Sequence, residues 1–480
     1  MRKQLLLAVL MVAALAVPSF ASVQNIKISG DVDSTYLYRH NFDLGAGLTA
    51  AAPTNTSDRL QSNFLTQTRL RADADLSDNV SATVGLINER SWNQDDSTTA
   101  NDSIDINLAF VTLREMLYSP LTVVIGRQVF SYGNSLIVDA TGTNNVGPGA
   151  SGITGVAQDL TKQTAMDAVR AILNYDPLKV EFLYSKISSG TVTGVPDLAR
   201  DDVDLYGVNT TYNLGDDMKS VVEAYFFAKI DQSVKRSTID STGDKNDVIY
   251  VPGLRASTNI LDGLNIQGEF AWQRGNKVGT TTSSSDIANQ KREAYAAQFI
   301  SNYSIPVAEE YKPNAQYVYT WVSGDQNPGD SYGNTNPGSV NRWTAWDPMF
   351  ENQGGGKVYN TLFDLTNMHI HSASLSAKPM EDVTVKGTWS GLWLDKNVDC
   401  TSGTCDSITI RQPDATASRT LAANSSKKGL GNEFDVELMY DYTEDVQFGL
   451  NLGWFNPGKV FTSVNDDMAS QAILHGNVAF

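Results

Sequence analysis

The stretch Glu433–Tyr440 reads EFDVELMY, and it shows the pattern that decides the fold. Acidic and apolar side chains alternate along it, with Glu433, Asp435 and Glu437 between Phe434, Val436, Leu438 and Tyr440. A period of two places the two sets on opposite faces of a β-strand. We therefore expect a strand with one wet face and one apolar face.

The same period recurs along the chain. Apolar side chains share one parity from Ile26 to Tyr38, and the segment Thr68–Leu76 repeats the pattern before the turn Ser77–Asn79. We expect eighteen strands, and the segments between them lack a helical period. The predicted ranges are 25–40, 61–76, 80–92, 103–115, 121–130, 165–175, 178–187, 202–213, 219–230, 246–257, 263–274, 291–303, 312–323, 364–379, 382–395, 430–442, 445–455 and 470–480.

The connections between these segments alternate in length. Even connections are short, as at Ser77–Asn79, Asp176–Pro177, Leu214–Asp217, Pro379–Glu381 and Thr443–Glu444. Odd connections are long and rich in Gly, Asn, Ser, Thr and Asp, as in 131–164, 324–363 and 396–429. Tight periplasmic turns and long outer loops alternate in this way in membrane barrels. The predicted fold class is all-β, a transmembrane antiparallel up-and-down β-barrel of about 18 strands.

Aromatic residues sort by the parity of the strand that carries them. The chain has 19 Tyr, 17 Phe and 8 Trp. Odd segments end in Trp92, Trp272, Trp321, Trp393 and Trp454, and even segments end in Tyr175, Tyr212, Tyr303, Tyr442 and Phe480. Interfacial aromatics form a girdle at each membrane surface of such barrels. Two girdles are therefore expected.

The first 21 residues have the parts of a secretory signal peptide. Arg2 and Lys3 are basic, Leu5–Val17 is apolar, and Ser19–Ala21 is a small-x-small cleavage site. The apolar stretch is shorter than the ~20 residues that a membrane-spanning helix needs. We expect cleavage after Ala21 and one barrel domain over 22–480. An exported barrel predicts the outer membrane of a Gram-negative-type bacterium.

Charge and composition exclude several classes of protein. The formal net charge is −18, and loss of Arg2 and Lys3 with the leader makes it −20. Nucleic-acid binding needs a basic surface, so it is not expected. Two cysteines and four histidines are too few for a Cys/His metal array. No Ser/His/Asp arrangement is evident, and we expect neither a cofactor nor an enzymatic activity.

Three segments resemble the alginate-export family of outer-membrane barrels. They are Gly126–Asn134 (GRQVFSYGN), Ser323–Asp325 with Trp346–Phe350, and Gly429–Asp435 with Gly453–Gly458. The resemblance implies an 18-stranded barrel that passes a polymer or small solutes passively. The final segment, which ends in Phe480, also resembles the terminal strand that barrel-assembly machinery recognises. The implied partners are outer-membrane lipid, that machinery, and a polysaccharide or small polar solute; the barrel is expected to be a monomer.

Charged side chains on the inferred inward parity are the candidate pore-lining residues. They are Lys27, Arg39, Arg69, Arg71, Asp73, Asp75, Arg127, Arg170, Glu269, Gln273, Glu433, Asp435 and Glu437. Arg127 shares the parity of Val123 and Ile125, so its placement requires a bulge or a reversed strand face. A polyuronate exporter needs a basic lumen, whereas this wall is mixed. The expected function is passive transport or export, and the alternative is a sheath or binding barrel that holds a partner protein.

The outer loops offer further candidates. For the nearly uncharged loop 131–164, the hypothesis is that it folds into the lumen and constricts it; the alternative is a mobile loop outside the barrel. Cys400 and Cys405 are expected to form a disulfide that staples a loop, with two free thiols as the alternative. Loop 324–340 has oxygen ligands for calcium, but turn formation explains its Asn, Asp and Gly better. His369 and His371 share one strand face without an evident third ligand, so no metal site is expected.

Overall fold

The structure is a computed structural model of the chain. It describes residues 25–45, 60–92, 104–142, 157–188, 202–232, 246–278, 289–325, 342–353, 357–397, 407–411 and 419–480. The predicted signal peptide, Cys400, Cys405 and nearly all of loop 324–340 lie outside these ranges.

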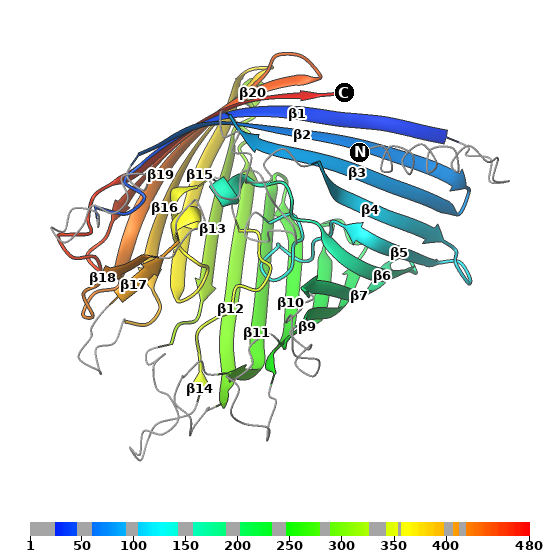
Figure 1. Ribbon diagram of the computed structural model, residues 1–480, viewed down its shortest axis with the longest axis horizontal. Helices are drawn as coiled ribbons and strands as arrows, with labels where there is room; N and C mark the ends of the chain where they lie inside the picture. The colour runs from blue at the N-terminus through cyan, green and yellow to red at the C-terminus, as the bar shows by residue number, and fades with distance from the viewer. Residues whose placement is uncertain are drawn as a thin grey trace, which may run out of the picture.

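The described residues form one closed antiparallel barrel of 18 strands (Figure 1). Each strand pairs with its neighbours in chain order, and the last strand pairs with the first from Asp31 with Ala479 to His40 with Ser470. Closure leaves no barrel strand with an unpaired edge, as a lipid-embedded sheet requires. The barrel strands are β1 (Asn25–His40), β2 (Leu60–Ser77), β3 (Val80–Ser91), β4 (Asp105–Arg114), β5 (Leu121–Gln128), β6 (Met166–Asn174), β7 (Leu178–Ser188), β8 (Val203–Asn213), β9 (Val221–Asp231), β10 (Asp247–Leu261), β11 (Leu264–Val278), β12 (Asn289–Ser304), β13 (Asn314–Val322), β15 (Met368–Met380), β16 (Val383–Leu394), β19 (Gly429–Asp441), β20 (Val446–Pro457) and β21 (Ala469–Ala479).

The predicted fold class, strand number and alternation of connections are confirmed. The lengths of the connections range from that of the short turn 381–382 to that of the long segment 323–367. The structure adds small elements that the period of two does not reveal: β14 (Arg342–Trp343), the hairpin β17 (Ser407–Ile410) with β18 (Arg419–Ala422), η3 (Gln158–Leu160), η4 (Glu309–Tyr311) and α3 (Val358–Leu362). No helix of the described residues is long and apolar enough to cross a membrane.

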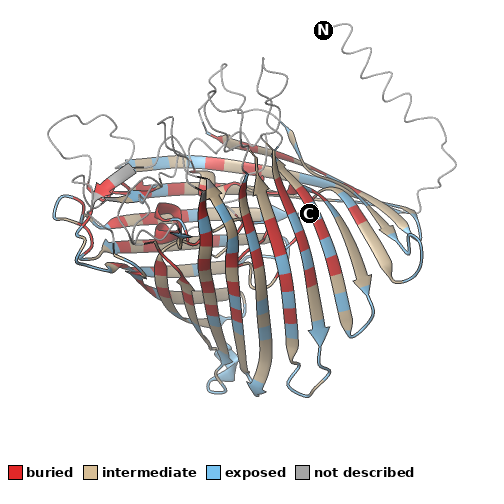
Figure 2. Cartoon of the chain, turned by 90° about the horizontal axis from the view of Figure 1, so that it is seen from below, coloured by how far each residue is buried: buried red, intermediate tan, exposed pale blue. Residues whose placement is uncertain are grey.

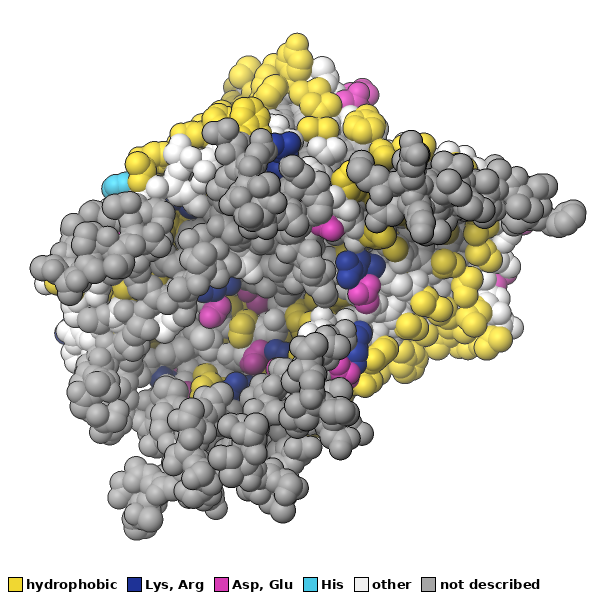
Figure 3. Space-filling model, viewed as in Figure 1, with side chains coloured by type: hydrophobic (Ala, Val, Ile, Leu, Met, Phe, Trp, Pro, Cys, Tyr) yellow, Lys and Arg dark blue, Asp and Glu magenta, His cyan; other side chains and the backbone are white. Residues whose placement is uncertain are grey.

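The two faces of the barrel wall differ as the alternation predicts. On β1, Ile26 and Ile28 are exposed on the outer face, whereas Leu37 and Arg39 are buried inside. Figure 2 shows the alternating bands of buried and exposed residues along the strands. Figure 3 shows apolar side chains along the upper and right margins of the molecule and charged side chains inside the opening.

Most aromatic residues of the two groups lie near strand ends, but Trp272 lies six residues before the end of β11 at Val278. Trp92 and Trp393 are exposed near ends that lead into long connections, and Tyr175, Tyr212 and Tyr442 are exposed at ends beside short turns. Ring contacts link neighbouring strands within a girdle; the Phe434 and Trp454 rings, for example, are stacked with centroids 6.4 Å apart. This arrangement fits a barrel that meets a membrane interface at both ends.

The main cluster of buried apolar side chains lies inside the barrel. It joins inward residues of the wall, such as Leu205 and Phe227, to Ile137, Trp346 and Leu362 from two long connections. Figure 1 shows both connections, coloured cyan and yellow, within the opening of the barrel. The lumen is therefore partly filled by the chain itself.

Candidate functional site

Parts of two connections fold into the lumen and pack on each other. We call residues 130–142, 157–165, 342–353 and 357–365 the lumenal plug. Its two connections meet at a parallel bridge between Val138 and Phe350, where Asp139 N–H donates to Phe350 O at 2.8 Å and Phe350 N–H donates to Ile137 O at 3.1 Å. The two connections thus pack on each other as one body inside the lumen.

Inward acidic side chains of the wall hold the first plug segment. Glu223 on β9 accepts the N–H of Gly133 at 3.1 Å, and Glu269 on β11 accepts the N–H of Asn134 at 2.8 Å. Gly133 has a φ of +60°, and a Cβ there would lie 2.8 Å from Glu269 Oε1. Glycine therefore allows the close approach of this turn to the wall.

Residues 157–165 of the plug lie against the first three strands. Arg39 on β1 forms a buried ion pair with Asp159. Glu89 on β3 accepts the Thr161 hydroxyl at 2.6 Å and the N–H of Lys162 at 2.7 Å. Hydrogen bonds to a charged acceptor are stronger than neutral ones, so Glu89 anchors this end of the plug.

Asp347 anchors the second connection on the opposite wall. Its backbone N–H and C=O both bond the Gln273 amide of β11, at 2.9 Å and 2.7 Å. Its carboxylate lies 3.7 Å from both Lys229 Nζ and Arg292 Nη2. Burial alone would raise the pKa of Asp347, but the charges of Lys229 and Arg292 hold that pKa below its ordinary value.

Two neighbouring carboxyl groups lie beneath α3. Glu433 on β19 accepts the N–H of Val358 at 3.1 Å and the N–H of Tyr359 at 2.6 Å, the first residues of this short helix. Asp435 follows on the same strand face and is fully buried, and neither of its oxygens has a hydrogen-bond partner among the residues that the structure describes. Burying a carboxylate without a hydrogen-bond partner is costly.

The predicted pore-lining residues divide into two groups. The first group lies on inward faces away from the plug contacts described above: Lys27, Arg69, Arg71, Asp73, Asp75 and Glu437. Several of these side chains form ion pairs: Arg69 with Asp31 at 2.7 Å, Arg71 with Asp73 at 2.7 Å, and Glu437 with Lys386 at 3.5 Å. A second group points inward and contacts the plug: Arg39, Arg170, Glu269, Gln273 and Glu433. The roles of this second group include holding the plug. Asp435 points inward on the same strand face as Glu433.

The structure places Arg127 on the outer face, which corrects the expectation that it lines the lumen. Its Cα partners are Ala109 and Asp167, and it shares the parity of Ile125, which is exposed. Arg127 pairs with Asp167 at 3.0 Å near the ends of β5 and β6. Gly126 has a positive φ but does not reverse the parity of the following residue.

Sequence reasoning missed other anchoring groups. The wall residues Glu89 and Glu223 were not singled out, although both have inward parity on predicted strands, and Asp347 of the plug was not singled out either. Parity alone could have placed the two wall residues inside, but it gives no sign of the backbone groups they bind. His369 and His371 lie on the outer face and bond Tyr319 and Tyr317; among the described residues no group of three potential ligands could hold a metal ion.

With this geometry in place, the similarity to known proteins is informative. A family model described as alginate export matches residues 25–474. The chain belongs to the alginate export family. No curated protein matches the sequence significantly. Together with the closed barrel, the family membership makes the chain a channel of the bacterial outer membrane that passes solutes or polysaccharide.

Solved structures of outer-membrane porins share the fold. Pseudomonas aeruginosa OccK2 (OpdF) in complex with glucuronate is 11% identical, with 95% of this chain and 98% of that chain covered and a TM-score of 0.52. P. aeruginosa OccK1 (OpdK) is 9% identical, with 95% and 99% covered and a TM-score of 0.54. At this identity the likeness concerns the fold alone.

The contact between Glu433 and α3 gives a first prediction. Glu433→Ala removes the acceptor of two buried N–H groups, which costs on the order of 1–3 kcal/mol for each group left unpaired. Amide hydrogen exchange of residues 358–362 should therefore become faster in the detergent-folded protein. Glu437→Ala on the same strand face is the matched control, and it should leave that exchange unchanged. Equal exchange in all three proteins would show that Glu433 does not hold the helix.

The depressed pKa of Asp347 gives a second prediction. A carboxyl group with a lowered folded-state pKa stabilises the docked plug above its unfolded pKa, and this stabilisation is lost as the pH falls through the folded value. Mean single-channel conductance should rise when the pH is lowered from neutral to below the ordinary Asp pKa of about 4, because the docked carboxyl group protonates only below that value. Asp347→Asn should already conduct more at pH 7 and change less on acidification. Identical pH profiles for the two proteins would contradict the anchoring role of Asp347.

Proposed function

We propose that this chain is a passive channel in which the lumenal plug sets the width of the passage. The supporting observation is the ring of plug contacts to β1, β3, β9, β11 and β19, which surround the lumen. A body fixed on so many sides narrows the lumen instead of hanging loosely in it. Such a passage suits small polar solutes, or a polysaccharide that passes as a single extended chain.

The charges of the wall favour weak selectivity for the sign of a solute. Arg69 with Asp31, and Arg170 with Glu181, place opposite charges within 2.7 Å and 2.6 Å of one another. Adjacent opposite charges cancel over a short distance, so they leave little field along the channel axis. Transport down a gradient also needs no catalytic residues, and we propose no enzymatic activity.

The alternative of a sheath for a partner protein is less well supported, because the chain's own segments occupy the lumen. We also propose that the barrel is a monomer, since one chain closes the sheet by itself. Phe480 N–H bonds Gly30 O at 2.9 Å, which makes the last residue part of the closing seam. This position supports recognition of the terminal strand by barrel-assembly machinery.

Removal of the first plug connection tests this function. A variant in which a short Gly/Ser linker replaces 131–164 should show a higher single-channel conductance in planar bilayers, because it lacks the segment that Glu89, Glu223 and Glu269 hold. Circular dichroism and the heat-dependent gel shift of a folded barrel serve as controls for folding. An unchanged conductance in a folded variant would refute the constriction.

A further inference from the structure

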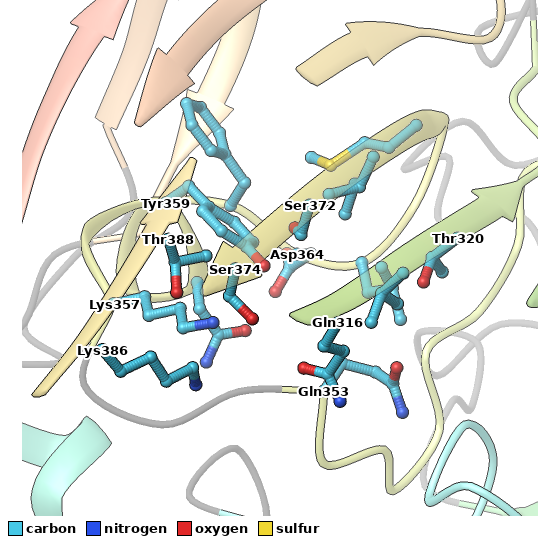
Figure 4. Close-up of a pocket in the computed structure, with 16 residues that line it drawn as sticks. Gln316, Thr320, Gln353, Lys357, Tyr359, Asp364, Ser372, Ser374, Lys386 and Thr388 are labelled. Atoms are coloured by element: carbon cyan, nitrogen blue, oxygen red, sulfur yellow. The ribbon is translucent and has the colours of Figure 1, made fainter. Parts of the chain in front are cut away.

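A cavity of about 140 Å³ lies between the wall and the second connection of the plug (Figure 4). Strands β13, β15 and β16 form its outer side, and plug residues between Gln353 and Leu365 form its inner side. For comparison, an apolar protein cavity of about 150 Å³ holds one benzene molecule. The enclosed space is therefore about the size of one benzene ring, and it is too small for an oligosaccharide.

One part of the cavity is apolar. Its side chains come from both sides: Val318, Met368 and Ile370 from the wall, and Phe363 and Leu365 from the plug. All except Val318 are buried. Apolar surfaces on two opposing sides favour a flat apolar ring, because both faces of the ring leave water on binding.

The other part of the cavity carries hydrogen-bond donors that lack strong partners. Lys357 Nζ makes no hydrogen bond or ion pair within the described part of the chain, and Lys386 Nζ reaches only Glu437, at 3.5 Å. Thr388 is 2% exposed, and its hydroxyl has no hydrogen-bond partner in the described ranges of the chain. Figure 4 shows the ends of Lys357, Lys386 and Ser374 close together. A buried polar group without a partner is costly, so a ligand that supplies acceptors would be stabilised here.

Nearby acids leave these donors available. Asp364 pairs with Arg411 at 3.3 Å, and Glu433 accepts the N–H groups of α3. Asp435 pairs with Thr388 in the register of β19 and β16. A Cβ placed on Gly453 of β20 would lie 2.9 Å from Asp435 Oδ1, so this oxygen lies on the side of β19 that faces β20. The charge of Lys357 acts on Glu433 and Asp435, and that of Lys386 acts on Asp435, so nearby carboxyl groups partly balance both ammonium groups. Among the described residues, only Glu437 lies within ion-pair distance of either one.

We propose that this cavity binds a small aromatic carboxylate. Its ring lies between Phe363 and Leu365 of the plug and the apolar residues of β13 and β15, and its carboxylate accepts hydrogen bonds from Lys357, Lys386 and the Thr388 hydroxyl. A charge-assisted bond to each lysine explains why an anion is preferred to a neutral ring of the same size. The inference rests on the proposed function, since the ligand reaches the cavity through the channel.

Binding of benzoate to the full-length folded barrel tests the proposal, measured by titration calorimetry in detergent. Benzoate should bind at least tenfold more tightly than benzyl alcohol, benzylamine or glucuronate. Lys357→Ala should weaken benzoate binding about tenfold, and Lys357→Ala with Lys386→Ala should abolish the preference for benzoate over benzyl alcohol. Lys179→Ala, which removes an inward lysine outside the cavity, should leave benzoate binding unchanged.

Equal binding of benzoate and benzyl alcohol would overturn the anion site, and tighter binding of glucuronate than of benzoate would overturn the aromatic assignment. An effect of Lys179→Ala as large as that of Lys357→Ala would assign binding to general lumen charge. The conductance of the same protein in KCl alone separates this inference from the proposed function. A conducting barrel that does not prefer benzoate refutes only the inference, whereas a folded barrel without conductance refutes the proposed function.

Discussion

Pairing of every backbone N–H and C=O within the sheet is the constraint on which this structure depends. A strand in lipid has no water to bond, so an open edge would leave a row of costly unpaired groups. The contact of β1 with β21 removes that edge, and it extends to the bond between Phe480 and Gly30. The two-residue period follows from the same constraint, because a closed wall has one face toward lipid and one toward the lumen.

Closure of so many strands also leaves a wide interior, and the chain fills part of it. The plug has backbone groups that need partners, and inward acids of the wall supply them. Glu89, Glu223, Glu269 and Glu433 each accept at least one backbone N–H of the plug. Glu269 and Glu433, which the sequence placed on the wet face of the wall, therefore also act as docking points, as do Glu89 and Glu223. This links the charge of the lumen to the width of the passage.

The sequence predicts the wall well, because a closed barrel imposes the same period on every strand. The pattern at Glu433–Tyr440 lies within β19 (Gly429–Asp441), which differs from the predicted range 430–442 by one residue at each end. It does not predict the plug, since the path of a loop depends on long-range contacts such as that of Val138 with Phe350. The helix α3 is equally hidden, because five residues show no helical period and Glu433, far along the chain, stabilises its start. Arg127 illustrates a further limit: the family motif suggested the lumen, while strand parity, which favoured the outer face, was correct.

The exclusion size of the channel tests the central claim most directly. Conductance of the folded barrel in planar bilayers can be measured with polyethylene glycols of increasing size, because polymers that enter the passage lower the current and larger ones do not. The account predicts an exclusion size well below that of an 18-stranded barrel with an empty lumen, and a larger size when 131–164 is replaced by a short linker. The exclusion size of an empty barrel in the unmodified protein would contradict the account.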